Sequence, residues 1–332
     1  MFSCKENKKQ FTILERNGMV WIPEGTFLRG SNHFDARGDE QPVHRVKISG
    51  FWMDKTEVTN AQFKTFVDET GYITTAEKAP VWEEIKQSLP EGTPKPPDSL
   101  FQPSSLTFRP TEGPVNLNDF NQWWHWTPQA SWRKPMGFGS SINDKMDHPV
   151  VHISWDDANA YARWAGKKLP TEAQWEWAAK GGQQDATYPW GNIGIDQGKP
   201  KANSWDGQFP YLNTERDNFF FTASVMSYQP NGYGLYDMAG NVWEWCSDWY
   251  SYDYYSDLKK QTTENPQGPD SSYDPNMPYL KQRVLRGGSF LCNDTYCSGY
   301  RVSARMRSSP DTGLQHTGFR LIKEGEMPSL TK

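Results

Sequence analysis

The segment Arg286-Gly-Gly-Ser-Phe-Leu-Cys-Asn-Asp-Thr-Tyr-Cys-Ser-Gly-Tyr-Arg-Val-Ser-Ala-Arg305 contains two of the four cysteines of the chain, Cys292 and Cys297. Five residues apart, these thiols could form a small disulfide, bind a soft metal ion or act as a redox pair. Zinc fits poorly, because a closed zinc site needs four nitrogen or sulfur ligands and no second Cys-x-x-Cys or paired His lies nearby. Two thiolates alone suit Cu(I). The spacing leaves the disulfide and the metal or redox site both open.

The composition indicates an irregular, aromatic-rich protein. The chain has 332 residues, enough for one large domain or two small ones. Sixteen Trp and 14% aromatic residues mean that rings supply much of the buried area, and 27 Gly and 24 Pro indicate many turns. A net charge of −5 gives no electrostatic reason to expect a nucleic-acid partner. No apolar stretch approaches the roughly 18 residues of a membrane-spanning helix.

Local patterns predict a few regular elements. Ser154 with Asp157, and Thr171 with Gln174, have capping-box spacing and each predict the start of a helix. The apolar spacing of residues 60–69 predicts a third helix. Residues 19–28 are typical of strand, turn and strand, and residues 43–48 alternate as in a half-buried strand.

Residues 80–147 show little periodicity but contain Trp123, Trp124, Trp126 and Trp132. A disordered linker would lack these rings, so we expect an ordered excursion packed on the core. Little helix is expected after Ala186. One α+β domain with low regular secondary structure follows, over residues 17–325, with tails at 1–16 and 326–332.

The motifs of the segment 286–305, followed by Thr317-Gly-Phe-Arg, resemble the C-terminal signature of the catalytic formylglycine-generating enzymes, the sulfatase-modifying factor family. Further matches cover most of the chain in order: Trp21-Ile-Pro-Glu-Gly-Thr-Phe, Glu57-Val-Thr-Asn, Ala130-Ser-Trp-Arg-Lys-Pro, His148-Pro-Val-Val-His-Ile-Ser-Trp-Asp-Asp-Ala, Leu169-Pro-Thr-Glu-Ala-Gln-Trp-Glu, Pro189-Trp-Gly-Asn and Asn231-Gly-Tyr-Gly-Leu-Tyr-Asp-Met-Ala-Gly-Asn-Val-Trp-Glu-Trp. The resemblance implies a single irregular domain of the C-type-lectin-like kind. It also implies an oxidase that uses copper, molecular oxygen and a thiol reductant to convert the cysteine of a sulfatase Cys-x-Pro-x-Arg motif to formylglycine.

The resemblance assigns roles residue by residue. Cys292 and Cys297 would hold Cu(I) as thiolates, and Ser289 and Tyr296 would line the oxygen and substrate pocket. Trp243 is a plausible partner in that pocket, although Trp245 is equally available by sequence. For Ser289, Tyr296 and Trp243 the alternative role is core packing or turn formation.

The resemblance also implies two calcium loops, one with Asn203, Ser204, Asp217 and Phe219 and one with Asp237, Gly240, Val242 and Glu244. Side-chain and backbone oxygens together suit calcium in a fold with few hydrogen-bond ladders. Ordinary Asn and Asp turns are the alternative.

Two features of the sequence depart from the family pattern. Asn293-Asp294-Thr295 are less basic than the versions typical of animal members, so peptide preference could differ here. Cys246 is expected to be a buried free thiol rather than a ligand.

Other functions and the location of the protein stay open. A non-catalytic cell-envelope module of the same fold would have a permanent disulfide and a filled or absent groove, whereas the enzyme would have an open groove beside the two cysteines. An enzyme acting on a small thiol metabolite would need a histidine-rich metal site, for which the sequence offers no clear candidate. Cys4 resembles the lipidated cysteine of an exported lipoprotein, or is incidental in a frayed tail; a native start at Met1 would predict a cytoplasmic protein.

Overall fold

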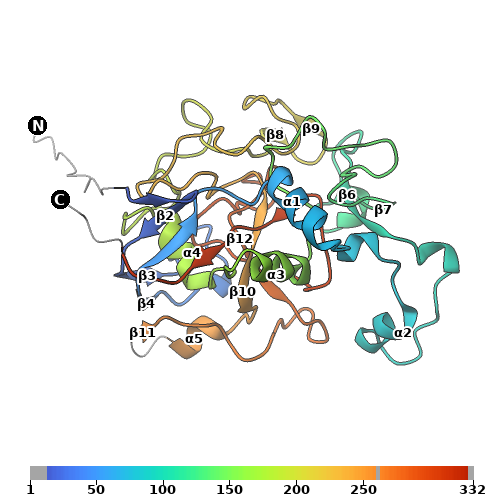
Figure 1. Cartoon of the computed structure of the whole chain (residues 1–332), viewed down its shortest axis with the longest axis horizontal. Helices are drawn as coiled ribbons and strands as arrows, with labels where there is room; N and C mark the ends of the chain where they lie inside the picture. The colour runs from blue at the N-terminus through green and yellow to red at the C-terminus, as the bar shows by residue number, and fades with distance from the viewer. Residues whose placement is uncertain (1–12, 259–261, 328–332) are drawn as a thin grey trace, which may run out of the picture.

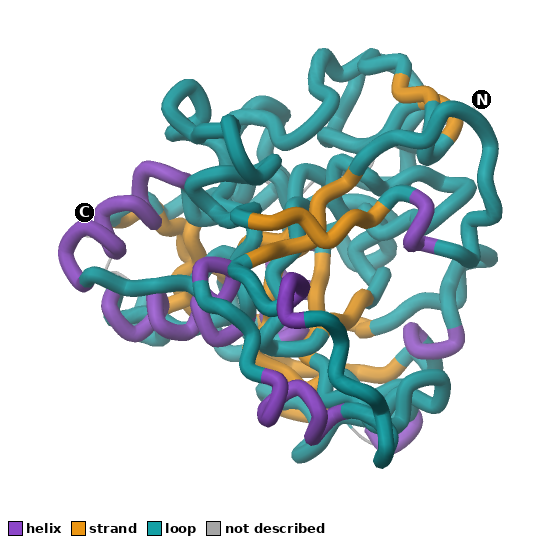
Figure 2. The backbone as a smooth tube through the Cα atoms, turned by 90° about the vertical axis from the view of Figure 1, so that its right-hand side faces the viewer, coloured by secondary structure: helices purple, strands orange, loops and turns teal. Residues whose placement is uncertain are grey.

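The computed structural model describes residues 13–258 and 262–327, and Cys4 lies outside these ranges. Short helices and strands are embedded in long loops (Figures 1 and 2). This confirms the expected single α+β domain with little regular secondary structure. No helix of the described ranges is both long and apolar enough to span a bilayer.

The strands form several small sheets. Their orders are β1-β2-β5-β15, β13-β12-β10-β14, β11-β4-β3, β6-β7 and β8-β9. The bounds are β1 Glu15–Arg16, β2 Met19–Ile22, β3 Gly25–Arg29, β4 His44–Ile48, β5 Phe51–Asp54, β6 Ser104–Phe108, β7 Trp124–Pro128, β8 Gly207–Gln208, β9 Leu212–Asn213, β10 Trp243–Trp249, β11 Thr263–Glu264, β12 Arg283–Arg286, β13 Met306–Ser308, β14 Thr317–Gly318 and β15 Ile322–Lys323. The strands predicted within 19–28 and 43–48 are confirmed. Because β1 pairs with β2, the first sheet begins inside the segment 1–16 that we expected to be a tail.

The helices follow their sequence signals. Their bounds are α1 Asn60–Thr70, α2 Trp82–Ile85, α3 Trp155–Trp164, α4 Glu172–Ala179 and α5 Tyr254–Leu258, with 3₁₀ turns at Gly38–Glu40, Thr75–Glu77, Lys86–Ser88, Asp98–Leu100 and Phe120–Gln122. The Ser154 side chain accepts from the Asp157 N–H at the start of α3, and Thr171 accepts from Gln174 at the start of α4. Gly71 ends α1 in the left-handed conformation, with φ of 66°. All three predicted helices are confirmed.

Aromatic rings build much of the core. Cys292 belongs to a buried cluster that includes Trp243, Trp245 and Tyr300. A neighbouring cluster consists mainly of rings, among them Trp123, and includes Phe290 and Leu291. Val302 belongs to a third cluster, so the segment 286–305 contributes to three buried clusters. The excursion 80–147 is ordered as expected, because it contains the β6-β7 hairpin and because Trp123 and Trp132 are fully buried.

Candidate active site around Cys292 and Cys297

The two ends of the segment 286–305 bind buried carboxylates of α4. Arg286 and Arg305, at these ends, both donate to Oε1 of Glu172, over 3.0 Å and 2.7 Å, and Arg286 also donates to Glu176 over 2.6 Å. Arg29 of β3 donates to the other oxygen of Glu172 over 2.6 Å. Burial opposes the charge on Glu172, but Arg305, Arg29 and Arg286 outweigh it and lower the pKa of this carboxyl to about 2. The cysteine segment is thus held by its ends to the first turn of α4.

Cys292 and Cys297 form a disulfide in this structure, with Cα atoms 5.4 Å apart. Asn293 shapes the turn between them, because its carbonyl oxygen accepts from the N–H groups of Tyr296, Cys297 and Ser298 over 2.9–3.1 Å. Its side-chain oxygen accepts from the Thr295 N–H over 2.9 Å. The spacing of five residues therefore does place the two sulfur atoms together. The structure shows the oxidised form of the pair, and metal binding would require its reduction.

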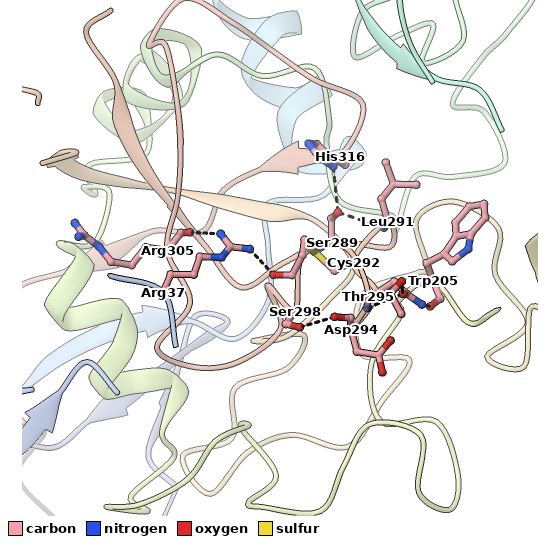
Figure 3. Close-up of a disulfide and its surroundings, with 12 residues drawn as sticks. Arg37, Trp205, Ser289, Leu291, Cys292, Asp294, Thr295, Ser298, Arg305 and His316 are labelled. Carbon is pink, nitrogen blue, oxygen red and sulfur yellow. Dashed lines mark hydrogen bonds between the residues drawn. A yellow bond between two sulfur atoms is a disulfide. The ribbon is translucent and has the colours of Figure 1, made fainter. Parts of the chain in front are cut away.

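Ser289 is fully buried and lies against Cys292. Its N–H lies 3.4 Å from Sγ of Cys292, and its carbonyl oxygen accepts from the Cys292 N–H over 2.9 Å. Its hydroxyl accepts from the Leu291 N–H over 3.3 Å and lies 3.1 Å from Nδ1 of His316 (Figure 3). The structure thus brings Ser289 to the cysteine pair.

Trp243 rather than Trp245 lies against the sulfur. A Cβ atom built on Gly299 would come within 2.5 Å of the Trp243 ring and 2.9 Å of Sγ of Cys292, so the ring and the sulfur share the space over this glycine. Trp245 is also buried, but its indole N–H donates to the Ile153 carbonyl oxygen over 2.8 Å. The geometry therefore favours Trp243 as the site residue.

Tyr296 stands at the edge of the site, with 36% of its surface exposed. Its ring stacks on Phe209 at a centroid distance of 4.4 Å and meets Trp123 edge-on at 5.6 Å. Burial raises the pKa of Tyr296, so the phenol is protonated at neutral pH. Its packing on the aromatic cluster fixes the ring while leaving part of it accessible.

Sequence reasoning missed two residues of this neighbourhood. Arg37 donates to the carbonyl oxygen of Cys297 and, over 3.2 Å, to that of Arg305 (Figure 3). Nothing local in the sequence identifies Arg37, which is 260 residues away from Cys297. His316 directly precedes the Thr317-Gly-Phe-Arg motif, which could have drawn attention to it.

The first predicted calcium loop has oxygen atoms available. Asp217 accepts from the N–H groups of Ser204 and Phe219 over 3.2 Å and 3.1 Å, so three of the four predicted residues are in contact. Oδ1 of the adjacent Asn203 is buried without a hydrogen-bond partner. This unsatisfied amide oxygen fits a hard cation.

The second predicted loop contacts the first, because a Cβ on Gly240 would lie 2.1 Å from the Asn203 carbonyl oxygen. Its carboxylates, however, already have protein partners. Asp237 accepts from the Met226 N–H over 2.8 Å, and Glu244 accepts from Arg320 twice and from the Trp175 indole, each over 2.7 Å. This loop fits a cation less well than the first does.

The surroundings of this second loop carry excess negative charge. Burial, opposed in part by the Met226 N–H, raises the pKa of Asp237 to about 6. Burial and the nearby Asp237 raise the pKa of Glu57, whose Oε2 lacks a hydrogen bond. Over residues 13–258 and 262–327, no group of three or more His, Cys, Asp or Glu side chains is arranged to hold a metal ion. A cation at either loop would therefore depend largely on amide and backbone oxygens.

Two adjoining cavities of about 630 Å³ and 1,010 Å³ share Pro189, Trp190, Pro230 and Asn231. Neither is lined by Cys292, Cys297, Ser289, Tyr296 or Trp243. A small cavity of about 80 Å³ is lined by Phe290 and Gln315, next in sequence to Ser289 and His316.

Comparison with known proteins gives consistent matches. Residues 5–325 match the family model of the sulfatase-modifying factor enzyme 1-like domain. The chain is 45% identical to the formylglycine-generating enzyme of Thermomonospora curvata, covering 91% of this chain and 92% of that protein, and 42% identical to that of Streptomyces coelicolor, covering 94% and 91%. The structure of PvdO from Pseudomonas aeruginosa has a similar fold, with a TM-score of 0.60 and 21% identity over 96% of this chain and 99% of that one. A mouse relative named inactive Cα-formylglycine-generating enzyme 2 is 36% identical, over 93% of this chain and 87% of that protein.

Proposed function

The chain belongs to the sulfatase-modifying factor enzyme 1-like family, and on that premise we propose that it converts the cysteine of a sulfatase Cys-x-Pro-x-Arg motif to formylglycine. The observation that carries the proposal is the arrangement of Cys292, Cys297, Ser289 and Trp243 in one buried site. The similarity to two proteins named formylglycine-generating enzymes, over more than nine-tenths of the chain, supports it.

The proposed reaction balances with oxygen and two equivalents of an external thiol. The substrate side chain –CH₂–SH is oxidised to a thioaldehyde, two thiols join as a disulfide, and O₂ is reduced by four electrons to two water molecules. Hydrolysis of the thioaldehyde to –CHO and H₂S consumes one of these, so that one water molecule remains in the net balance. The substrate carbon supplies two electrons and the thiols supply two. A thiol reductant would also open the Cys292–Cys297 disulfide before each series of turnovers.

Cu(I) fits the two sulfur atoms of the reduced site, since two soft thiolate donors suit this ion and no third protein ligand would block a substrate thiolate. Copper would supply the site for oxygen activation. Ser289 would stabilise the thiolate of Cys292, because its N–H points at Sγ over 3.4 Å. Trp243 would exclude water from the buried side of the pair, and Tyr296, which is protonated and about one-third exposed, would meet the substrate at the rim.

We also propose that calcium occupies the first predicted loop, through Asn203, Ser204, Asp217 and Phe219. The unsatisfied Oδ1 of Asn203 supports this assignment. The same loop is tied to the cysteine segment, since the Trp205 N–H donates to the Cys292 carbonyl oxygen over 3.0 Å. For the second loop, with Asp237, Gly240, Val242 and Glu244, calcium would have to share Glu244 with Arg320.

The test is the incubation of the reduced, copper-loaded protein with a Cys-x-Pro-x-Arg peptide in air, followed by mass spectrometry. We expect the peptide to lose about 18 Da, and we expect no loss with Cys292→Ala or Cys297→Ala. Cys246→Ala is the matched control, because Cys246 is a buried free thiol outside the pair, as the sequence predicted. An intact peptide in the presence of bound copper would reject the proposal for this motif.

A non-catalytic interaction module is the second candidate. The disulfide in this structure and the similarity to a relative named inactive favour it. It predicts that Cys292 and Cys297 stay joined under thiol concentrations that reduce accessible disulfides. Alkylation of both residues after mild reduction of the folded protein would argue against this candidate.

A further inference from the structure

We propose that His316 is a positioning residue, which donates to the Ser289 hydroxyl and so fixes the orientation of Ser289 beside Cys292. The inference rests on the proposed function and adds to it a residue outside the cysteine segment. Nδ1 of His316 lies 3.1 Å from Oγ of Ser289, and both side chains are buried. His316 is 27 residues away from Ser289 in the sequence, so the tertiary fold makes this contact.

Ser289 is the residue through which such an effect would reach the sulfur. Its main chain is bonded to Cys292 in both directions, through the Ser289 N–H to Sγ and through the Cys292 N–H to the Ser289 carbonyl oxygen. The orientation of its hydroxyl therefore decides whether a donor or a lone pair faces the space beside Cys292. A hydroxyl has one proton and two lone pairs.

The hydrogen bonds around the hydroxyl favour one arrangement. The Leu291 N–H occupies one lone pair over 3.3 Å. An Nδ1–H donor from His316 would occupy the other, and the hydroxyl proton would then point away from both donors. Within residues 13–258 and 262–327 no hydrogen bond joins Nε2 of His316 to another residue, and 8% of the surface of His316 is exposed, so Nε2 is left to solvent. We therefore assign the ring proton to Nδ1, from which the ring donates to Ser289.

His316 is neutral and firmly held. Burial, assisted by the nearby His152, lowers the pKa of His316 to about 3, so the ring has a single N–H at neutral pH. Its ring meets Trp124 edge-on at 4.7 Å. Its carbonyl oxygen accepts from the Trp243 N–H over 2.8 Å. The residue thus stands between two groups of the site, Ser289 through its side chain and Trp243 through its main chain.

Kinetics of peptide conversion test the role. His316→Phe keeps a ring beside Trp124 but has no N–H, and we expect kcat to fall about a hundred-fold with KM unchanged, as when a single oriented donor is removed from an active site. His316→Asn can donate from the position of Nδ1 and should recover most of kcat. Ser289→Ala should lower kcat to the same extent as His316→Phe. The double variant should be no slower than Ser289→Ala, because His316 acts through Ser289. Additive losses, or wild-type kcat in His316→Phe, would overturn the proposal.

A measurement without turnover separates this inference from the proposed function. Long-range ¹H–¹⁵N spectra of the reduced protein at neutral pH should show His316 as the Nδ1–H tautomer, with resonances that move in Ser289→Ala. An Nε2–H tautomer would contradict the proposed arrangement even if the enzyme is active. If the wild type converts no peptide, the proposed function fails, and the tautomer still reports on whether His316 donates to Ser289.

Discussion

Gly299 is the position where the smallest change should disturb the site most. An alanine Cβ there would come within 2.5 Å of the Trp243 ring and 2.9 Å of Sγ of Cys292. Ordinary contacts begin at 3.4 Å, so the ring would have to move by about 0.9 Å, and the sulfur by about 0.5 Å. Both groups are buried and have little room to shift.

The expected cost follows from this crowding. Forcing one extra methyl group into a packed core costs about 1–3 kcal/mol, so Gly299→Ala should lower the free energy of unfolding by that amount. A displacement of about 1 Å at reacting groups costs about a hundred-fold in rate. Peptide conversion should therefore fall about a hundred-fold, which corresponds to about 2.7 kcal/mol and is similar in size to the loss of stability.

Urea unfolding of the reduced protein and peptide conversion measured by mass spectrometry would check the two effects. Gly113→Ala is the matched control, because a Cβ at Gly113 would meet no atom within 4 Å, and both quantities should stay at their wild-type values. If Gly299→Ala has wild-type stability and rate, Trp243 and Cys292 do not enclose Gly299 as described, and the assignment of Trp243 to the site loses its support.

Three further predictions concern other parts of the molecule. Arg37→Gln should lower the rate of peptide conversion about ten-fold or more, because the Cys297 carbonyl oxygen loses its donor. The free energy of unfolding should change by only about 1 kcal/mol, since a few half-buried hydrogen bonds are lost. An unchanged rate would contradict this prediction. Burial and the neighbouring Glu172 raise the pKa of Asp248 to about 6 in the folded state, so the wild type should lose stability as pH rises from about 4 to 7. The difference in unfolding free energy between Asp248→Asn and the wild type should then grow in favour of the variant by about 2–3 kcal/mol over that range. Urea unfolding at a series of pH values measures this difference, and a constant difference would contradict the reasoning. Calcium should raise the unfolding midpoint of the wild type but not of Asn203→Ala, with the chelated proteins as references, and calorimetric binding of equal strength to both would exclude Asn203 as a ligand.

The parts of the fold that local physics determines could be predicted from the sequence. The capping boxes at Ser154 and Thr171 mark the starts of α3 and α4 because a cap is made by residues three apart. The turn between Cys292 and Cys297 is equally local, since Asn293 supplies most of its hydrogen bonds. The β1 strand escaped prediction because it has two residues, Glu15 and Arg16, and its pairing with β2 rather than its composition defines it.

The rest of the site could not be predicted because its contacts join distant segments through groups without a local pattern. Arg37 reaches Cys297 by donating to a main-chain oxygen, an interaction that any residue type at position 297 would allow. Trp243 and Trp245 are two residues apart on β10, so the alternation of the strand places both on the same face and both join the cluster of Cys292. Only the position of Gly299, between the Trp243 ring and Sγ of Cys292, decides which indole meets the sulfur.

Contacts between distant residues also attach the cysteine segment to the buried ion pairs of α4 and to the aromatic clusters. Glu172 holds both ends of the segment through Arg286 and Arg305, and removal of either arginine would leave this buried carboxylate with less compensation. The middle of the segment is held mainly by neutral groups: Trp205 on the Cys292 carbonyl oxygen, Asn293 on the Trp205 carbonyl oxygen, and His316 on Ser289. Arg37 is a charged donor in this part, but it binds the Cys297 carbonyl oxygen rather than the sulfur. The groups beside Sγ of Cys292 are the Ser289 N–H and the Trp243 ring. Such an environment favours a thiolate through directed hydrogen bonds, which is what the proposed binding of a soft cation and a substrate thiolate requires.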